Sequence, residues 1–408
     1  MKIDSRFYAW SIVLYPWLSI YGTLINGVSV GDLLLLIDLV YIAFFSRNRF
    51  QIRKPLSVRN HVLFLTYCLL SVCFISLFVD VNFWFVAKRF LKYTLFIVVI
   101  IYMCKGACNK KEFYRAFTMF SRVSCVAIII QYLVFYSIGK YVEFKIPLLK
   151  YCNDVVESID YTSSALISFR PHSLFLEPAH FTYFISMYLI FLLFNSNRVS
   201  RINRIGEAIV VTACMISSVS STAIIIVAIV WVSYLLQLLF NRKAKFVENN
   251  RLLIIVIIAI CAIVGFRFYM SSPQLSYSLN RLLFSQNETL ATSTWGRLDS
   301  GKSLVESLNF AQKLFGMGLG NLPSASTYLS SVYYILYCTG YLGAIIYAIW
   351  GVHAFIESSL EGKLILVVVV ALCVSSPIII SGYIMLYNAL IYLPQLYIKC
   401  DNSLNKED

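Results

Sequence analysis

The sequence predicts an all-α integral membrane protein, and its composition and the length of its apolar runs are the observations that predict it. Of the 408 residues, 59% are hydrophobic and 13% are charged, and the mean hydropathy is +0.76. Soluble domains carry about 25% charged residues, so this chain is too apolar to be one. Apolar runs of about 20 residues, enough to cross the roughly 30 Å hydrocarbon core of a bilayer, recur from end to end.

We expect one polytopic domain, residues 1–408, with about 12 membrane-spanning helices. Their predicted ranges are 7–27, 30–45, 61–79, 84–104, 117–138, 178–195, 206–219, 222–240, 252–270, 327–350, 364–379 and 381–398. The polar stretch Ser217–Thr222 divides one pair, because an unbroken helix there would far exceed the bilayer thickness. The first run lacks a small-residue cleavage site, so we expect it to stay in the mature protein.

Basic residues gather in alternate connections between the predicted spans, which is typical of cytoplasmic loops. The residues concerned are Arg47, Arg49, Arg53, Lys54, Arg59, Lys105, Lys110, Lys111, Arg115, Arg198, Arg201, Arg204, Arg242, Lys243, Lys245 and Arg251. With an even number of spans, both termini are then cytoplasmic. The net charge of +14 follows from this bias, so we expect no nucleic-acid partner.

No sequence pattern typical of a metal or nucleotide site occurs in the chain. It contains no CxxC, no HExxH, no paired Cys/His spacing and no GxxxxGK[ST] loop. Of the cysteines, only Cys152 lies clearly in an outer loop, which leaves no disulfide framework there. We expect no metal ion and no cofactor.

Two outer segments, 139–177 and 271–326, are long enough to hold chemistry. The first ends in SFRPHSLFLEPAHF, residues 168–181, which contains Arg170 and Glu177. Pro178 predicts the first turn of a helix, with Glu177 at its N-cap and His180 within the first turn. An ordinary cap with a snorkelling arginine would explain these residues, but such clustering at a membrane boundary favours a functional site.

A basic cluster, Lys88, Arg89 and Lys92, lies at the outer end of the fourth predicted span, where the positive-inside bias disfavours it. Lys88 and Lys92 are one helical turn apart and are expected to share a face. Three such cations suit a lipid-linked phosphate or pyrophosphate. The alternative is that they anchor the helix by snorkelling.

The second outer segment contains STWGRLDSGKSLVESLNFAQKLFGMGLGN, residues 293–321, with Arg297 and Lys302 among small residues. Helical spacing of apolar residues from Leu304 to Leu314 predicts an amphipathic helix at the membrane surface. The glycines that follow stand at alternate positions, which allows a tight turn or a close backbone approach to a ligand.

The motif R-P-x-S-x-F-x-E-P before a span, followed by a later loop with arginine and F-G-x-G-x-G-N, resembles the O-antigen polymerase and ligase superfamily, most closely the polymerases. The resemblance implies metal-independent glycosyl transfer between undecaprenyl-pyrophosphate-linked repeat units at the periplasmic face of the bacterial inner membrane. It implies that Arg170 and Arg297 engage pyrophosphate and that Glu177 is the motif's acidic residue. Gly316, Gly318, Gly320 and Asn321 match the glycine turn.

The candidate catalytic residues are therefore Arg170, Glu177, His180 and Arg297, with Glu177 or His180 as general base. The candidate pyrophosphate-binding residues are Lys88, Arg89, Lys92, Lys302, Gly318, Gly320 and Asn321. The lipid bilayer, a chain-length regulator and a flippase are the implied partners.

Other functions stay open at this stage. The resemblance implies that a ligase would carry a catalytic histidine in the later outer loop. No histidine lies between Ser271 and Ser326, so a ligase or related glycan transferase is disfavoured. A lipid-linked oligosaccharide flippase should place more charge within the spans, and a structural or sensory protein predicts no outer charge cluster. Asp32 and Asp38 both lie within the second span, six residues apart and so not on one helical face. For each we expect interior pairing with a basic residue, and we assign them no function.

Overall fold

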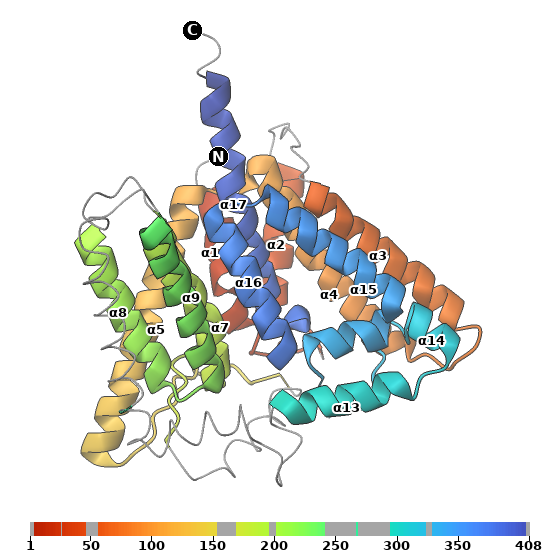
Figure 1. Cartoon of the computed structure of the whole chain (residues 1–408), viewed down its shortest axis with the longest axis horizontal. Coiled ribbons are helices and arrows are strands. Elements are labelled where there is room, and N and C mark those ends of the chain that lie inside the picture. Colours follow the sequence, from red (N-terminus) through yellow and green to blue (C-terminus); the bar gives the residue numbers. More distant parts are fainter. Residues whose placement is uncertain are drawn as a thin grey trace. The chain divides into compact units, whose positions relative to one another are not determined.

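In a computed structural model of the chain, all the regular secondary structure among the described residues is helical (Figure 1), so the all-α prediction is confirmed. The structure describes residues 4–25, 27–45, 56–152, 169–195, 201–240, 267, 294–323 and 329–404. Among these, five segments are apolar and long enough to cross a membrane: Leu56–Ile75, Phe83–Ala107, Lys110–Ile138, Ser221–Leu239 and Ser331–Glu357. The chain is therefore consistent with a membrane protein, while the larger number of spans stays a prediction.

Helices occur at every predicted range except 252–270, which apart from residue 267 lies outside the described residues. They are α1 (Asp4–Leu18), α2 (Val30–Phe45), α3 (Leu56–Ile75), α4 (Phe83–Tyr102), α5 (Lys110–Ile138), α7 (Pro178–Phe194), α8 (Arg201–Ser217), α9 (Ser221–Phe240), α13 (Thr294–Glu306), α14 (Phe310–Phe315), α15 (Ser331–Glu357), α16 (Leu360–Ser375) and α17 (Tyr383–Leu404). A π-helical turn, Met103–Ala107, continues α4, and a 3₁₀ turn, Ile378–Ile380, precedes α17. The predicted break between α8 and α9 is confirmed.

The first predicted helix was too long. α1 ends at Leu18, and the chain then turns back through Gly27, whose φ of +86° is left-handed. In this turn Gly22 N donates to Lys150 O over 2.8 Å. The backbone between α1 and α2 therefore bonds to the first outer segment and does not continue the helix.

The chain forms two compact units. Unit 1 comprises Met1–Ser124, Phe144–Ala165 and Gly296–Asp408, and unit 2 comprises Cys125–Glu143 and Leu166–Trp295. In unit 1, α3 packs along α15 in the opposite direction (Figure 1). Glu357 at the C-terminal end of α15 accepts a hydrogen bond of 2.8 Å from Leu56 N at the start of α3. The N-terminal end of α15 therefore lies toward the C-terminal end of α3.

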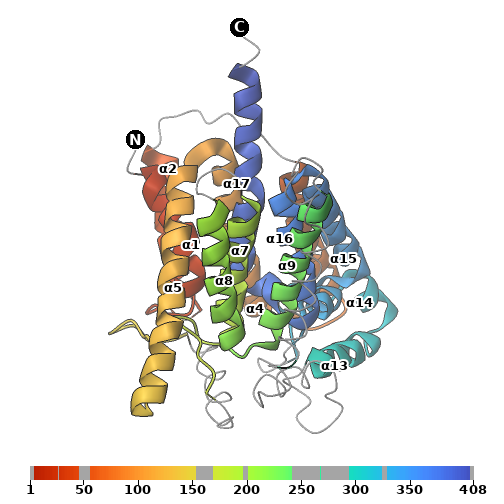
Figure 2. The same cartoon turned by 60° about the vertical axis from the view of Figure 1, so that its left-hand side comes forward.

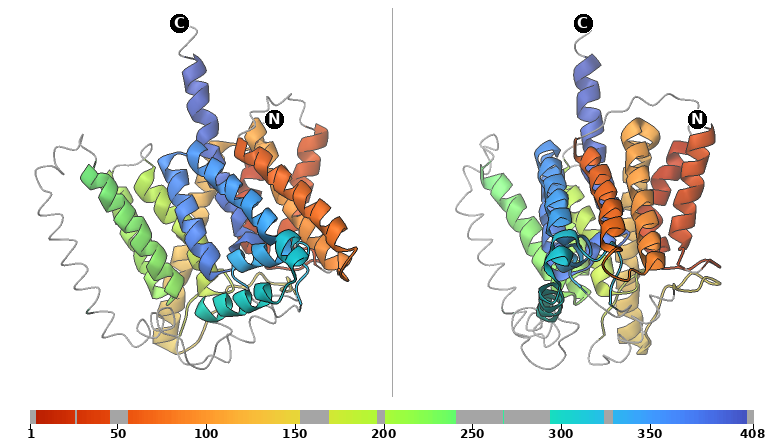
Figure 3. Two further views of the ribbon diagram at one scale, coloured as in Figure 1. Left: turned by 45° about the vertical axis from the view of Figure 1, so that its right-hand side comes forward. Right: turned by 90° about the vertical axis from the view of Figure 1, so that its right-hand side faces the viewer.

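At that end of unit 1, α13 runs across the ends of the longer helices, as the left panel of Figure 3 shows in teal, and the right panel views it nearly along its own axis. Gly301 lets α13 approach α15, because a Cβ there would lie 2.5 Å from the Tyr333 side chain. This transverse orientation is the one expected of a helix at a membrane surface. In unit 2, α7, α8 and α9 pack on one another (Figure 2), and α7 is apolar on all sides.

Candidate functional site

The basic cluster occupies the first half of α4, in unit 1, and Lys88 lies apart from the other two side chains. Lys88 Nζ lies 4.9 Å from the centre of the Trp84 ring and also contacts Gly27. Arg89 and Lys92 are three residues apart on one face and line a common cavity. Lys88 does not line that cavity, so the cation that shares it with Lys92 is Arg89 and not Lys88.

The cavity, here called the α4 cavity, has a volume of about 20 Å³, room for about one water molecule, and it opens to solvent. Its lining residues are Phe64, Arg89, Lys92, Tyr93, Phe96, Leu319, Tyr334, Ile335 and Ile379. Tyr93 and Tyr334 are buried, beside Tyr347 and Cys338 respectively. Two cations beside an apolar wall at an opening suit the anionic head of a ligand that carries an apolar chain.

The glycine turn, residues 316–321, docks on a kink in α15. Gly340, inside α15, has φ +65° and ψ −175°. This break releases two carbonyl groups from the helix, and they accept hydrogen bonds from the turn. Met317 N donates to Tyr337 O and Gly318 N to Cys338 O, each over 2.9 Å.

The glycine turn also contacts the basic cluster directly. Gly320 has φ +88°, and a Cβ on it would lie 2.4 Å from Arg89 Cγ. Asn321 donates to Met317 O over 2.9 Å and accepts from Asn82 N, at the N-cap of α4, over 3.4 Å. Gly318 N and the Asn321 side chain, which the sequence predicted to bind ligand, thus hold the glycine turn in place. Leu319 of this turn forms part of the cavity wall.

Arg297 joins α13 to the end of α16. Its Nη1 donates to Ser375 O, at the last residue of α16, over 2.7 Å, where a cation is favoured by the helix dipole. Lys302 is 63% exposed and pairs with Glu306 over 3.9 Å on the same helix. Neither residue lines the α4 cavity.

The predicted amphipathic helix Leu304–Leu314 is wrong in its boundaries. α13 ends at Glu306 and α14 begins at Phe310. Asn309 divides them because it forms a capping box with Gln312, with two reciprocal hydrogen bonds of 2.9 Å. Asn309 therefore starts a new helix.

In unit 2, the R-P-x-S-x-F-x-E-P motif ends at α7 as the proline predicts. Glu177 is the N-cap, with φ −134° and ψ 151°, and Pro178 is the first helical residue. His180 lies in the first turn. Burial lowers the pKa of His172, against the opposing charges of Glu143 and Glu177.

Gln131 of α5 holds the motif and was not anticipated from the sequence. Its Oε1 accepts from Ser173 N over 2.8 Å, and its Nε2 donates to Val142 O over 2.9 Å and to Ser173 O over 3.3 Å. The Phe169 ring stacks on Phe135 with the ring centroids 4.0 Å apart. Arg170 follows Phe169 directly, so its backbone is anchored on α5. The sequence signal that could have identified Gln131 is a glutamine within an apolar run, because a polar side chain there needs a hydrogen-bond partner.

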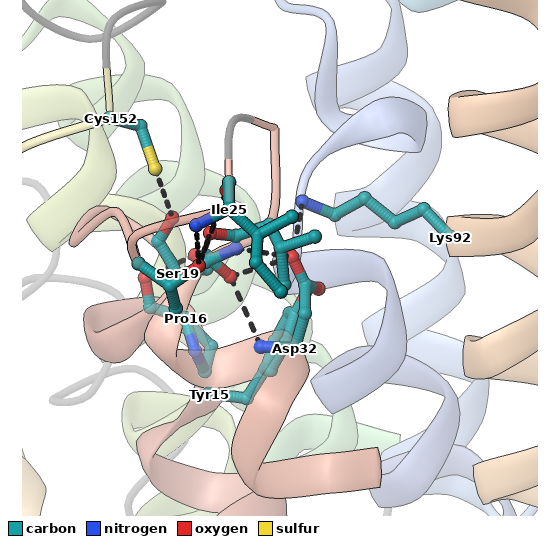
Figure 4. A network of polar contacts seen from close by, with 10 residues as sticks. Tyr15, Pro16, Ser19, Ile25, Asp32, Lys92 and Cys152 are labelled. Carbon is teal, nitrogen blue, oxygen red and sulfur yellow. Dashed lines mark hydrogen bonds and ion pairs between the residues drawn. The ribbon is translucent and has the colours of Figure 1, made fainter.

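Asp32 pairs with Lys92, as expected of an acid within the second span, whereas the buried Asp38 forms no ion pair with any residue that the structure describes. Asp32 Oδ2 lies 3.6 Å from Lys92 Nζ, and Tyr15 Oη donates to Asp32 Oδ1 over 2.6 Å (Figure 4). The carboxylate thus joins α1, α2 and α4 beside the α4 cavity.

Arg170, Glu177 and His180 belong to unit 2, whereas Arg297 and the α4 cluster belong to unit 1. Compared with models of known protein families and with characterised proteins, the sequence matches none significantly. The likeness to the polymerase and ligase superfamily therefore depends on the motifs alone.

Proposed function

We propose that the chain is a membrane glycosyltransferase that polymerises polyprenyl-pyrophosphate-linked repeat units into a surface polysaccharide. The α4 cavity is the observation that carries this proposal. It places Arg89 and Lys92, for a phosphate group, beside apolar side chains such as Phe64, Phe96 and Leu319 at an opening to solvent, where the first part of a lipid chain can lie. The motifs in residues 168–181 and 297–321 support the same reaction class.

The proposed reaction exchanges one glycosidic bond for another. An acceptor sugar hydroxyl attacks the anomeric carbon of the donor glycan, and the bond from that carbon to the lipid pyrophosphate breaks. The hydroxyl proton passes to a general base, and the lipid pyrophosphate leaves with the bonding electron pair. Glu177 or His180 is the proposed base, on the strength of the motif.

Negative charge builds on the pyrophosphate leaving group in the transition state. Without a metal ion, the protein can lower the activation barrier by stabilising this charge with its own cations. Arg89 can bind a phosphate group with two parallel hydrogen bonds, and Lys92 adds a second positive charge. Both stand in a largely apolar cavity, where electrostatic stabilisation is stronger than in water. Arg170 and Arg297 keep the pyrophosphate-engaging role that the motifs give them.

The proposal is tested by glycan analysis in the source bacterium after deletion of the gene. Deletion should reduce the polysaccharide ladder to a single repeat unit, and the wild-type chain should restore it. Arg170→Ala, Glu177→Ala, Arg297→Ala and Arg89→Met should not restore it. Arg115→Ala, a cation 73% exposed on α5, is the matched control and should restore the full ladder.

Two results contradict the proposal. One is a full ladder from all four site variants, which excludes the assigned residues. The other is loss of every attached glycan, single repeats included, on gene deletion, which instead indicates a transferase that attaches the finished glycan.

A further inference from the structure

Asp32 is fixed in place more firmly than an ordinary surface carboxylate. It lies in the first turn of α2, where the helix dipole favours negative charge. Ser29 and Asp32 form reciprocal capping contacts: Ser29 N and Oγ donate to Asp32 Oδ2 over 3.0 and 2.7 Å, and Asp32 N donates to Ser29 Oγ over 3.1 Å. Tyr15 of α1 fixes the other carboxylate oxygen. Each oxygen of the carboxylate is therefore held (Figure 4).

Lys92 is the mobile member of the pair. Its side chain is 27% exposed, against 13% for Asp32, and its ammonium group ends a flexible four-carbon stem. The 3.6 Å separation is longer than the roughly 2.7–2.9 Å of a direct charge-assisted hydrogen bond. Asp32 therefore attracts the ammonium group while leaving its three N–H donors able to reach a second anion.

The second anion has a place on the same side of α4. Lys92 lines the α4 cavity together with Arg89, whereas Asp32 does not line it. Without a counter-ion, two cations on one face of a helix repel each other, and the more flexible lysine would turn toward solvent. The fixed carboxylate of Asp32 reduces the repulsion between Arg89 and Lys92 and keeps the Lys92 ammonium group from turning toward solvent.

We propose that Asp32 is a positioning residue, which holds the Lys92 ammonium group at the α4 cavity so that it meets the phosphate group of the lipid-linked substrate together with Arg89. The ligand in this inference rests on the proposed function, but the placement of Lys92 does not. Asp32 stays bound to Ser29 and Tyr15 throughout, and Lys92 bridges it to the incoming anion.

The placement of Lys92 is tested by chemical labelling of the purified full-length protein. A brief pulse of acetic anhydride is followed by peptide mass spectrometry, and the labelling of Lys92 is divided by that of Lys88 in the same molecules. Lys88 contacts Trp84 and Gly27 and serves as the internal reference. In Asp32→Asn the ratio should rise about fivefold, because Lys92 becomes more accessible. An unchanged ratio overturns the inference.

The link to the ligand is tested with farnesyl diphosphate as the probe, in a double-mutant cycle. Asp32→Asn should weaken binding about tenfold in the wild-type background, the worth of one charged contact. In a Lys92→Met background the same substitution should change binding less than twofold. An equal loss in both backgrounds shows that Asp32 acts through the fold and overturns the inference.

The two proposals fail in different ways. If the wild-type protein does not bind farnesyl diphosphate, the proposed function fails and the ligand part of the inference fails with it, while the labelling ratio still decides whether Asp32 places Lys92. If the wild-type protein binds the probe but the labelling ratio does not move, only the role of Asp32 is wrong.

Discussion

Replacing Gly340 with alanine tests the docking of the glycine turn on the α15 kink. Its φ of +65° with ψ −175° is a backbone conformation that is essentially restricted to glycine. A Cβ there would lie 2.4 Å from Leu314 O and 2.6 Å from Gly316 N, which are backbone atoms and cannot rotate away. Strain of about 1–3 kcal/mol adds to overpacking of about 1–3 kcal/mol. The expected destabilisation is therefore about 2–6 kcal/mol.

The assay is thermal unfolding of purified protein in detergent, followed by intrinsic fluorescence. Gly340→Ala should lower the apparent Tm by roughly 2–7 °C, because the unfolding entropy of a chain of this length is large. Gly351→Ala, on the same helix, is the matched control, because a Cβ there meets nothing within 4 Å. It should be neutral or stabilising by up to about 1 kcal/mol, since alanine favours a helix over glycine. Equal Tm values for the two variants would refute the docking described here.

Four further predictions address unit 2, Arg297 and the glycine turn. Gln131→Leu should increase the rate of hydrogen exchange at Ser173 N at least tenfold, because this amide loses its bond to Gln131 Oε1. An unchanged exchange rate would contradict the role of Gln131. Because the pKa of His172 is lowered by burial, the unfolded chain binds its proton more readily, so stability should fall as pH drops below about 6.5, and His172→Asn should flatten that pH dependence of Tm. Arg297→Met should destabilise the protein by about 1–2 kcal/mol through the lost bond to Ser375, and Arg297→Lys should recover part of the lost Tm. Gly320→Ala should weaken binding of farnesyl diphosphate by displacing Arg89; unchanged affinity would show that the turn does not set the cavity.

Much of the fold could be predicted because the length of a membrane-spanning helix and the residues at its ends are set by short stretches of sequence. Apolar run length located the helices, the serine-rich stretch located the break between α8 and α9, and Pro178 located the start of α7. The end of α1 was missed because the backbone contact of Gly22 with Lys150 is long-range. The division of α13 from α14 was missed although its signal, Asn309 with Gln312, was local.

The candidate site was predictable in residue types but not in geometry. The basic cluster was found by its position, yet which two cations share a cavity depends on the approach of the glycine turn to Arg89. That approach requires the kink at Gly340, about 20 residues later in the sequence. Asp32 was expected to find a basic partner, but only the packing of α2 on α4 identifies it as Lys92.

Farnesyl diphosphate binding to the purified protein, in a neutral detergent without anionic lipid, is the decisive measurement for the α4 cavity as a diphosphate site. We expect saturable binding that is at least tenfold weaker in Arg89→Met and in Lys92→Met. Lys88→Met should change the affinity less than twofold, because Lys88 lies outside the cavity, and farnesol, which lacks the diphosphate, should not compete. Equal losses in all three variants would indicate attraction to general positive charge, and that result, or no binding at all, would contradict the assignment of the α4 cavity.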